Sequence, residues 1–243
     1  MYGKNINDLN TKKKIKPINL NFAKLYKISS EKEFSYFKLL LSKNKLCTIK
    51  EKNFYFYINN GLINLNGKNY SFDSKRTFFS KSNLTFNATK STAIFIFFQK
   101  NKETVKIEKK NLAKKNKFYI VKNSSIREKY WGKIITLFSN NIGACKIIFM
   151  KNRSQSSMEF HIKKKENYYI NYGKIDLGIR YGRAKQKIIK LPKKCSFLML
   201  PGTMHMRMAK LDTQIIEMST KDNDDDSIIV HDGKKFKFVE TRK

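Results

Sequence analysis

The chain has 243 residues and carries 52 lysines and arginines against 19 aspartates and glutamates, a formal net charge of +33. Its three cysteines, Cys47, Cys145 and Cys195, are odd in number and widely spaced, which excludes a disulfide framework. The longest apolar run, residues 93–98, is too short to cross a bilayer, and residues 1–7 lack the apolar core of a signal peptide. We therefore expect a cytoplasmic protein with no membrane partner.

The positive charge would attract polyanions, but it does not by itself indicate a nucleic-acid-binding protein. Most of the excess is lysine, spread along the chain with abundant Asn, Ile, Phe and Tyr, as an AT-rich genome would produce. The sequence shows no helix-turn-helix, zinc-finger or ribonucleoprotein motif. We expect no specific nucleic-acid partner and a preference for small phosphorylated or carboxylated ligands.

The first half of the chain consists of short apolar runs separated by turn residues, a pattern typical of antiparallel strands. The predicted strands lie at residues 53–58, 62–66, 68–70, 77–79, 84–86 and 93–98. Only residues 31–42 and 124–130 have a pattern compatible with a short helix. The sequence therefore predicts an all-β protein.

The strand pattern of residues 53–70 is repeated at 167–178, which indicates a duplicated barrel whose closed or stacked sheets protect the strand edges. The predicted organisation is a flexible tail at 1–20, a β domain at 21–108, a lysine-rich linker at 109–122 and a second domain at 123–240. No histidine precedes His161, so we expect the first domain to lack a metal site. Its predicted role is packing, against the second domain or in a homodimer.

Two of the three histidines in the chain fall into a pattern with two carboxylates. Glu159 and His161 are two residues apart, so on a strand both side chains point to one face. Glu166 opens a run that ends at Gly173 and predicts the next strand, and His205 follows a Pro-Gly turn. Imidazoles and carboxylates from neighbouring strands suit a divalent Mn, Fe, Co, Ni or Zn ion and do not choose among them.

These segments resemble the two-motif signature of the cupin superfamily, G-x5-H-x-H-x4-E-x6-G followed by G-x5-P-x-G-x2-H-x3-N. The four ligand positions of that signature hold Glu159, His161, Glu166 and His205, with Glu159 in place of the first histidine. Four other positions depart from it and hold Arg153, Lys194, Leu200 and Ala209. The resemblance implies a double-stranded β-helix, the jelly-roll barrel of cupins, present twice in tandem, with a divalent metal bound by the four residues.

Within the cupins, residues 128–234 most resemble the type II mannose-6-phosphate isomerases. Residues 157–168 follow the S-L-Q-x-H-x-H-R-x-E-H-W pattern of that subgroup, and residues 130–132 correspond to its P-W-G motif. Residues 144–149 and 216–229 match further segments. One departure is Lys163, which stands where the subgroup often has a second histidine.

This resemblance implies an isomerase that acts on a small anionic sugar or sugar phosphate. Glu166 or Glu159 would move a proton between adjacent carbons of a substrate polarised by the metal. Lys146, Arg180 or Arg183 would hold the phosphate.

Two other functions stay open. Metal-dependent oxygenase or lyase chemistry is one, because open imidazole–carboxylate sites serve it equally well. A non-catalytic sugar-binding module is the other. Residues 163–165, three consecutive lysines, are expected to form a solvated face or to contact an anionic substrate. The acidic run at 222–226 is expected to be a solvated loop, since its spacing is not that of a calcium loop.

Overall fold

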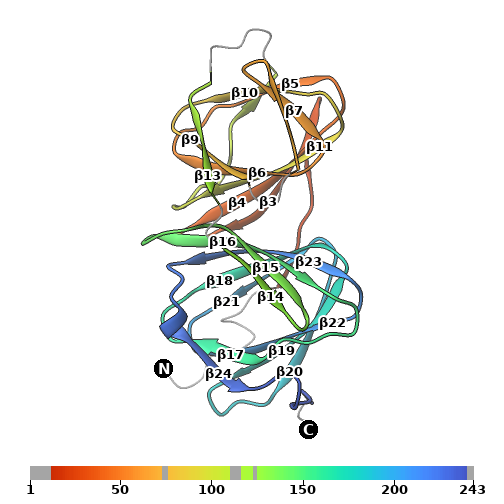
Figure 1. Ribbon diagram of the computed structural model, residues 1–243, viewed down its shortest axis with the longest axis vertical. Coiled ribbons are helices and arrows are strands. Elements are labelled where there is room, and N and C mark those ends of the chain that lie inside the picture. Colours follow the sequence, from red (N-terminus) through yellow and green to blue (C-terminus); the bar gives the residue numbers. More distant parts are fainter. Residues whose placement is uncertain (1–11, 73–75, 110–115, 123–124, 240–243) are drawn as a thin grey trace. The chain divides into compact units, whose positions relative to one another are not determined.

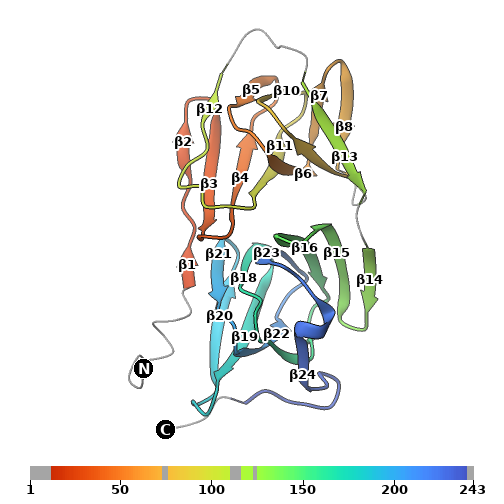
Figure 2. The same cartoon turned by 90° about the vertical axis from the view of Figure 1, so that its left-hand side faces the viewer.

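The structure is a computed structural model that describes residues 12–72, 76–109, 116–122 and 125–239. The described residues are nearly all in strands and turns, with one 3-10 helix among them, η2 (Asp224–Asp226). They divide into two compact units, one of residues 15–124 and one that joins the start of the chain, up to residue 14, to residues 125–243. Figures 1 and 2 show that each unit is a barrel of antiparallel strands. The all-β fold with two tandem barrels is thereby confirmed.

The first barrel is built from a seven-stranded sheet, in the order β13-β9-β6-β11-β4-β3-β2, and a five-stranded sheet, in the order β12-β5-β10-β7-β8. Its strands are β2 (Ile18–Leu20), β3 (Ala23–Ser30), β4 (Ser35–Leu41), β5 (Lys45–Ile49), β6 (Phe54–Asn60), β7 (Leu62–Leu65), β8 (Lys68–Ser71), β9 (Arg76–Ser80), β10 (Leu84–Ala88), β11 (Thr92–Phe98), β12 (Ile107–Glu108) and β13 (Phe118–Lys122).

The interior of the first barrel is apolar and rich in phenylalanine. Phe56 and Phe78 stack with ring centroids 4.8 Å apart, and Phe37, Phe54 and Phe98 are fully buried beside them. Alternate residues of neighbouring strands supply these rings, and burying each ring contributes about 1.5–3 kcal/mol. The residues described in this barrel thus pack a core of phenylalanine and aliphatic side chains, with one buried cysteine, Cys47, among them.

The second barrel has the same arrangement, with a seven-stranded sheet ordered β1-β21-β18-β23-β16-β15-β14 and a five-stranded sheet ordered β20-β19-β22-β17-β24. Its strands are β1 (Lys12–Lys14), β14 (Ser125–Lys129), β15 (Gly132–Ser139), β16 (Gly143–Met150), β17 (Met158–His161), β18 (Glu166–Tyr172), β19 (Lys174–Tyr181), β20 (Lys187–Pro192), β21 (Cys195–Met199), β22 (Thr203–Ala209), β23 (Thr213–Thr220) and β24 (Ser227–His231).

Several segments have structure that the sequence did not predict. Residues 12–14 and 18–20, expected in a tail, are strands β1 and β2, and residues 118–122, expected in a linker, are strand β13. Strand β1 pairs with β21 and so extends a sheet of the second barrel. The boundary between the two units falls between residues 124 and 125.

The two predicted helices, at 31–42 and 124–130, are wrong. They contain strands β4 and β14 instead. Strand β4 contains three leucines and one lysine, residue types that favour helices, yet it lies between β3 and β11 and is hydrogen-bonded on both edges. Pairing and burial in the sheet outweigh a propensity difference that amounts to tenths of a kcal/mol per residue.

Gly173 is the single residue between β18 and β19, where the chain passes from the seven-stranded sheet to the five-stranded one. Its φ of +82° lies in the left-handed region. A Cβ at this position would lie 2.3 Å from the carbonyl oxygen of Asp212 and 2.7 Å from Cα of Thr213. Backbone on the neighbouring turn therefore leaves room only for glycine.

Replacing Gly173 with alanine should lower the free energy of unfolding by more than the same change at Gly182. Both glycines have positive φ, +82° and +53°, but nothing lies within 4 Å of a Cβ at Gly182. The left-handed conformation costs alanine about 1–2 kcal/mol at either site, and the clash adds to that cost only at Gly173. Chemical denaturation of both variants measures the difference. Equal losses would contradict the steric argument.

Candidate metal centre

The four predicted ligands come from both sheets of the second barrel. Glu159 and His161 lie on β17, and His205 lies on the neighbouring strand β22, directly opposite Glu159 in the antiparallel register. Glu166 is the first residue of β18 in the other sheet. The two-residue spacing of Glu159 and His161 and the cross-strand pairing with His205 place three ligand-type side chains on one face of the five-stranded sheet.

The side chains of Glu159, His161 and His205 offer ligand atoms that all lie within 4.8 Å of one another. Glu166 is beside this group, with Oε1 3.1 Å from Nε2 of His205 and Oε2 3.7 Å from Nε2 of His161. Metal–ligand bonds to imidazole and carboxylate are about 2.0–2.2 Å long, so small side-chain shifts would bring these atoms around one ion. The Glu/His/His group can hold a divalent metal, as the sequence predicted.

Backbone carbonyls orient both imidazoles for this role. Nδ1 of His161 is 3.1 Å from the carbonyl oxygen of Asp226, and Nδ1 of His205 is 3.0 Å from that of Thr203. A carbonyl only accepts hydrogen bonds, so Nδ1 of each ring carries the proton and donates it. In a neutral ring Nε2 then keeps a free lone pair, and in both residues Nε2 is the nitrogen nearest Glu166.

Burial and charge set the protonation of the four groups. Burial lowers the pKa of the His161 imidazole, despite the nearby Glu166 carboxylate. Burial also disfavours the charged form of His205, but the carboxylates of Glu166 and Glu159 outweigh it and raise its pKa to about 9. Both carboxyl pKa values are lowered against the effect of burial, that of Glu159 chiefly by Arg207 and that of Glu166 chiefly by Lys164. Two ionised carboxylates are thus present, and an ion would have to displace the Nε2 proton of His205, so metal binding would release a proton.

Two buried cations that the sequence did not single out hold these carboxylates. Arg207, on β22, donates from Nη2 to Oε1 of Glu159 over 2.5 Å and from Nη1 to the hydroxyl of Tyr168 over 3.1 Å. Its guanidinium also lies over the rings of Trp131 and Tyr168. Arg207 follows His205 by two residues, so the same spacing that joins Glu159 and His161 could have found it.

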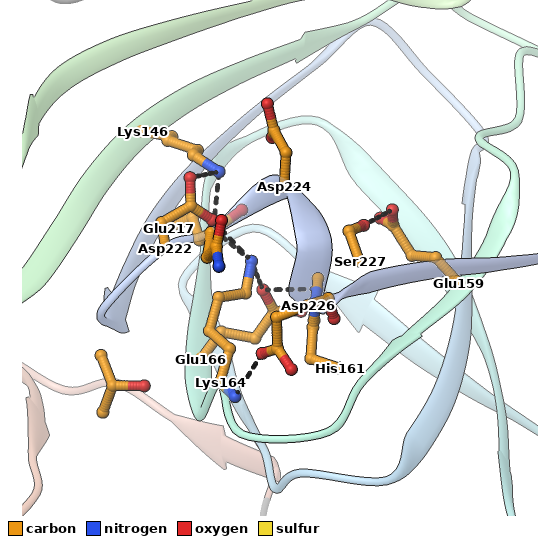
Figure 3. A network of polar contacts seen from close by, with 12 residues as sticks. Lys146, Glu159, His161, Lys164, Glu166, Glu217, Asp222, Asp224, Asp226 and Ser227 are labelled. Atoms are coloured by element: carbon orange, nitrogen blue, oxygen red, sulfur yellow. Dashed lines mark hydrogen bonds and ion pairs between the residues drawn. The ribbon is translucent and has the colours of Figure 1, made fainter.

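Lys164 is the second cation, and it is buried, with 5% of its side chain exposed. The expected solvated lysine face is therefore wrong at this residue, although the neighbouring Lys163 is exposed. The ammonium lies 2.8 Å from Oε2 of Glu166 and within 3.4 Å of carboxylate oxygens of Glu217 and Asp222 (Figure 3). Nothing in a run of three lysines marks the middle one for burial.

A cavity of about 400 Å³ opens onto this network. The polar residues that line it include Arg127, Lys129, Lys146, Glu159, His161, Lys164, Glu166, Arg207, Glu217 and Asp222. Lys146, a predicted substrate-binding residue, pairs with Asp222 over 2.7 Å and is in register with Glu217. The other two predicted substrate-binding residues, Arg180 and Arg183, do not line this cavity. Arg180 instead donates to the carbonyl of Gly182.

Asp226 organises the loop between β17 and β18. Its carboxylate accepts hydrogen bonds of 2.9–3.2 Å from the backbone N–H groups of Ile162, Lys163 and Lys164, and its carbonyl accepts from His161. Asp226 is buried, so the acidic run at 222–226 is not wholly solvated as predicted. One residue thus positions both His161 and the backbone of Lys164.

No helix among the described residues is long and apolar enough to cross a membrane. Comparison with models of protein families finds no match, and comparison with curated proteins finds none either.

Comparison with solved structures finds oxalate decarboxylases. One, studied for its substrate binding mode, has a TM-score of 0.70 and 8% identity over 94% of this chain and 81% of its own. The Bacillus subtilis enzyme, described with Mn(II) centres, has a TM-score of 0.68 and 8% identity, over 94% of this chain and 81% of its own. The Lactobacillus farciminis enzyme, in complex with formate, has a TM-score of 0.67 and 8% identity, over 94% of this chain and 90% of its own. The chain therefore shares the tandem-barrel fold of these structures, as the resemblance to cupins implied. These structures do not support the specific likeness to mannose-6-phosphate isomerases.

Replacing Asp226 with alanine should lower the free energy of unfolding by about 1–3 kcal/mol, because buried backbone N–H groups lose their acceptor. The looser loop should also weaken binding of Mn²⁺ by about tenfold or more. Denaturation and metal titration of the full chain measure both effects. The exposed Asp225→Ala is the matched control. Equal behaviour of the two variants would show that the Asp226 carboxylate positions nothing.

Proposed function

We propose that the second barrel is the catalytic centre of a metal-dependent lyase that acts on a small carboxylate. The observation that carries the proposal is the Glu159–His161–His205 group at a cavity that is also lined by the buried cations Lys164 and Arg207. An ion bound by these three residues and Glu166 would hold and polarise a carboxylate oxygen. The likeness of fold to oxalate decarboxylases over 94% of the chain supports the same class of substrate.

The substrate class follows from the charges that line the cavity. Lys164 and Arg207 are already desolvated, so a carboxylate that enters would meet cations without the cost of burying them. The buried Lys164 ammonium and Arg207 guanidinium line the cavity and suit the binding of an acid of a few carbon atoms. Of the three residues that the isomerase hypothesis assigns to phosphate, Lys146 lines the cavity, whereas Arg180 and Arg183 do not. The lyase alternative therefore fits the geometry better than the isomerase hypothesis.

The two carboxylates have different access to the cavity. The side chain of Glu159 is 18% exposed, whereas that of Glu166 is 2% exposed. Both are ionised, so neither is a source of protons in this state. We assign both to binding of the ion, with Glu159 as the ligand nearer to the substrate, and water supplies the proton that the reaction consumes. In decarboxylation the bond between two carbons breaks, carbon dioxide leaves, and a proton takes its place on the remaining carbon.

Turnover assays with the metal-loaded full chain test the proposal. The protein, loaded in turn with Mn²⁺, Fe²⁺, Co²⁺, Ni²⁺ and Zn²⁺, is incubated with oxalate, malonate and other short acids, and carbon dioxide and oxygen consumption are recorded. We expect metal-dependent release of carbon dioxide from at least one acid. The His161→Ala variant should lose about 100-fold or more of that activity, since it lacks a ligand.

The same preparation discriminates the other functions. Incubation with mannose 6-phosphate or fructose 6-phosphate in deuterated water would show an isomerase by deuterium uptake at carbon. Uptake there, with no turnover of any acid, would reject the lyase proposal in favour of the isomerase. Metal-dependent oxygen consumption would favour an oxygenase, and sugar binding without any turnover would favour a binding module.

A further inference from the structure

Lys164 occupies an unusual place beside the candidate metal centre. Its ammonium contacts three carboxylates, at 2.8 Å from Glu166, 3.3 Å from Asp222 and 3.4 Å from Glu217. Its backbone N–H is held by Asp226, so the residue is fixed at both ends. Figure 3 shows the side chain reaching from the loop toward Glu217 and Asp222.

A comparison of ion-pair partners with those of Lys146, the other lysine of the network, shows what distinguishes Lys164. The ion pairs described for Lys146 are with Asp222 at 2.7 Å and Glu217 at 3.9 Å. Those two carboxylates therefore have Lys146 as well as Lys164. Glu166 is bound by Lys164 at the oxygen that also faces Nε2 of His161, 3.7 Å away.

A metal ion and the Lys164 ammonium would compete for that oxygen. An ion shared by His161 and Glu166 would lie a few ångströms from Nζ, where two positive charges repel by several kcal/mol at the dielectric of a protein site. The ammonium would then have to release Glu166. Asp222 and Glu217 are still within its reach, and the cavity that Lys164 lines gives it room to move.

We infer that Lys164 is an internal cation that stands in for the metal at Glu166 and, when an ion displaces it, becomes a donor for the carboxylate of the substrate. The inference rests on the metal site of the proposed function and adds a specificity-determining residue to it. Without metal, Lys164 keeps the buried Glu166 compensated. With metal bound, the same ammonium is available at the cavity wall.

The charge of the site supports this exchange. The cavity lining carries five carboxylates, Glu159, Glu166, Glu217, Asp222 and Asp224, and five cationic side chains, Arg127, Lys129, Lys146, Lys164 and Arg207. These charges balance one another without a metal. A divalent ion gives the lining a positive excess, which a bound carboxylate lowers. Anion binding is therefore expected to follow metal binding.

The Lys164→Met variant tests the inference in the full chain, with Lys163→Met as the matched control. Both remove one positive charge from adjacent residues, but Lys163 is exposed. The affinity for Mn²⁺ and Zn²⁺ is measured by competition with a chromophoric chelator. We expect Lys164→Met to bind both ions at least about tenfold more tightly than wild type, because the competing charge is gone. Lys163→Met should bind them as wild type does.

A second measurement follows the anion. Paramagnetic broadening of the formate resonance by protein-bound Mn²⁺ reports formate binding without depending on turnover. Lys164→Met loaded with Mn²⁺ should bind formate at least about tenfold more weakly than loaded wild type. Lys164→Gln, which keeps a hydrogen-bond donor, replaces the Met variant if that variant unfolds.

The outcomes separate this inference from the proposed function. Equal or weaker metal binding by Lys164→Met would overturn the stand-in role, and unchanged formate binding would overturn the donor role. If wild type binds metal and formate but turns over no acid, the proposed lyase fails while the role of Lys164 can stand. If neither protein binds metal, the inference is overturned.

Discussion

The clustering of four carboxylates inside one barrel, Glu166 and Glu217 buried and Glu159 and Asp222 half-buried, is the constraint on which the rest of the second unit depends. An ionised carboxylate in a protein interior is stable only with a paired charge and satisfied hydrogen bonds. The barrel meets this need with Arg207 at Glu159, Lys164 at Glu166 and Lys146 at Asp222. Side chains from both sheets and from the loop between β17 and β18 are thereby fixed around one cavity.

The two barrels have the same arrangement of strands but differ in what fills their interiors. Both consist of one seven-stranded and one five-stranded sheet. The first fills its interior with phenylalanine, which stabilises the fold and excludes water, whereas the second keeps polar groups and a cavity at the corresponding depth. Buried ion pairs contribute little net stability compared with an apolar core. Among the described residues, the second barrel combines an apolar core with a polar network at its cavity, an arrangement that favours a binding role. Dimer formation stays a prediction.

The sequence predicted six strands of the first barrel and four ligand-type residues, three of which the structure brings within 4.8 Å of one another, because both depend on local spacing. Alternation fixes the side-chain face on β17, and a Pro-Gly turn marks the start of β22. The ion-pair partners of these residues could not be predicted, because Lys164 and Glu217 are 53 residues apart in the sequence. Lys146, Glu217 and Tyr168 lie in one row only because of the register of strands β16, β23 and β18. A lysine run is normally solvated, so burial of its middle member depends on tertiary structure. The same holds for residues 35–41, where sheet pairing outweighed helix propensity.

Anomalous diffraction from crystals of the full chain soaked in Mn²⁺ tests the central claim, that the carboxylates and imidazoles form a metal centre. The account predicts one strong peak within about 2.0–2.3 Å of ligand atoms from Glu159, His161, Glu166 and His205. It also predicts that Nζ of Lys164 has moved away from Glu166. A map without a peak there, with the Lys164–Glu166 ion pair still at its present 2.8 Å, would contradict the account.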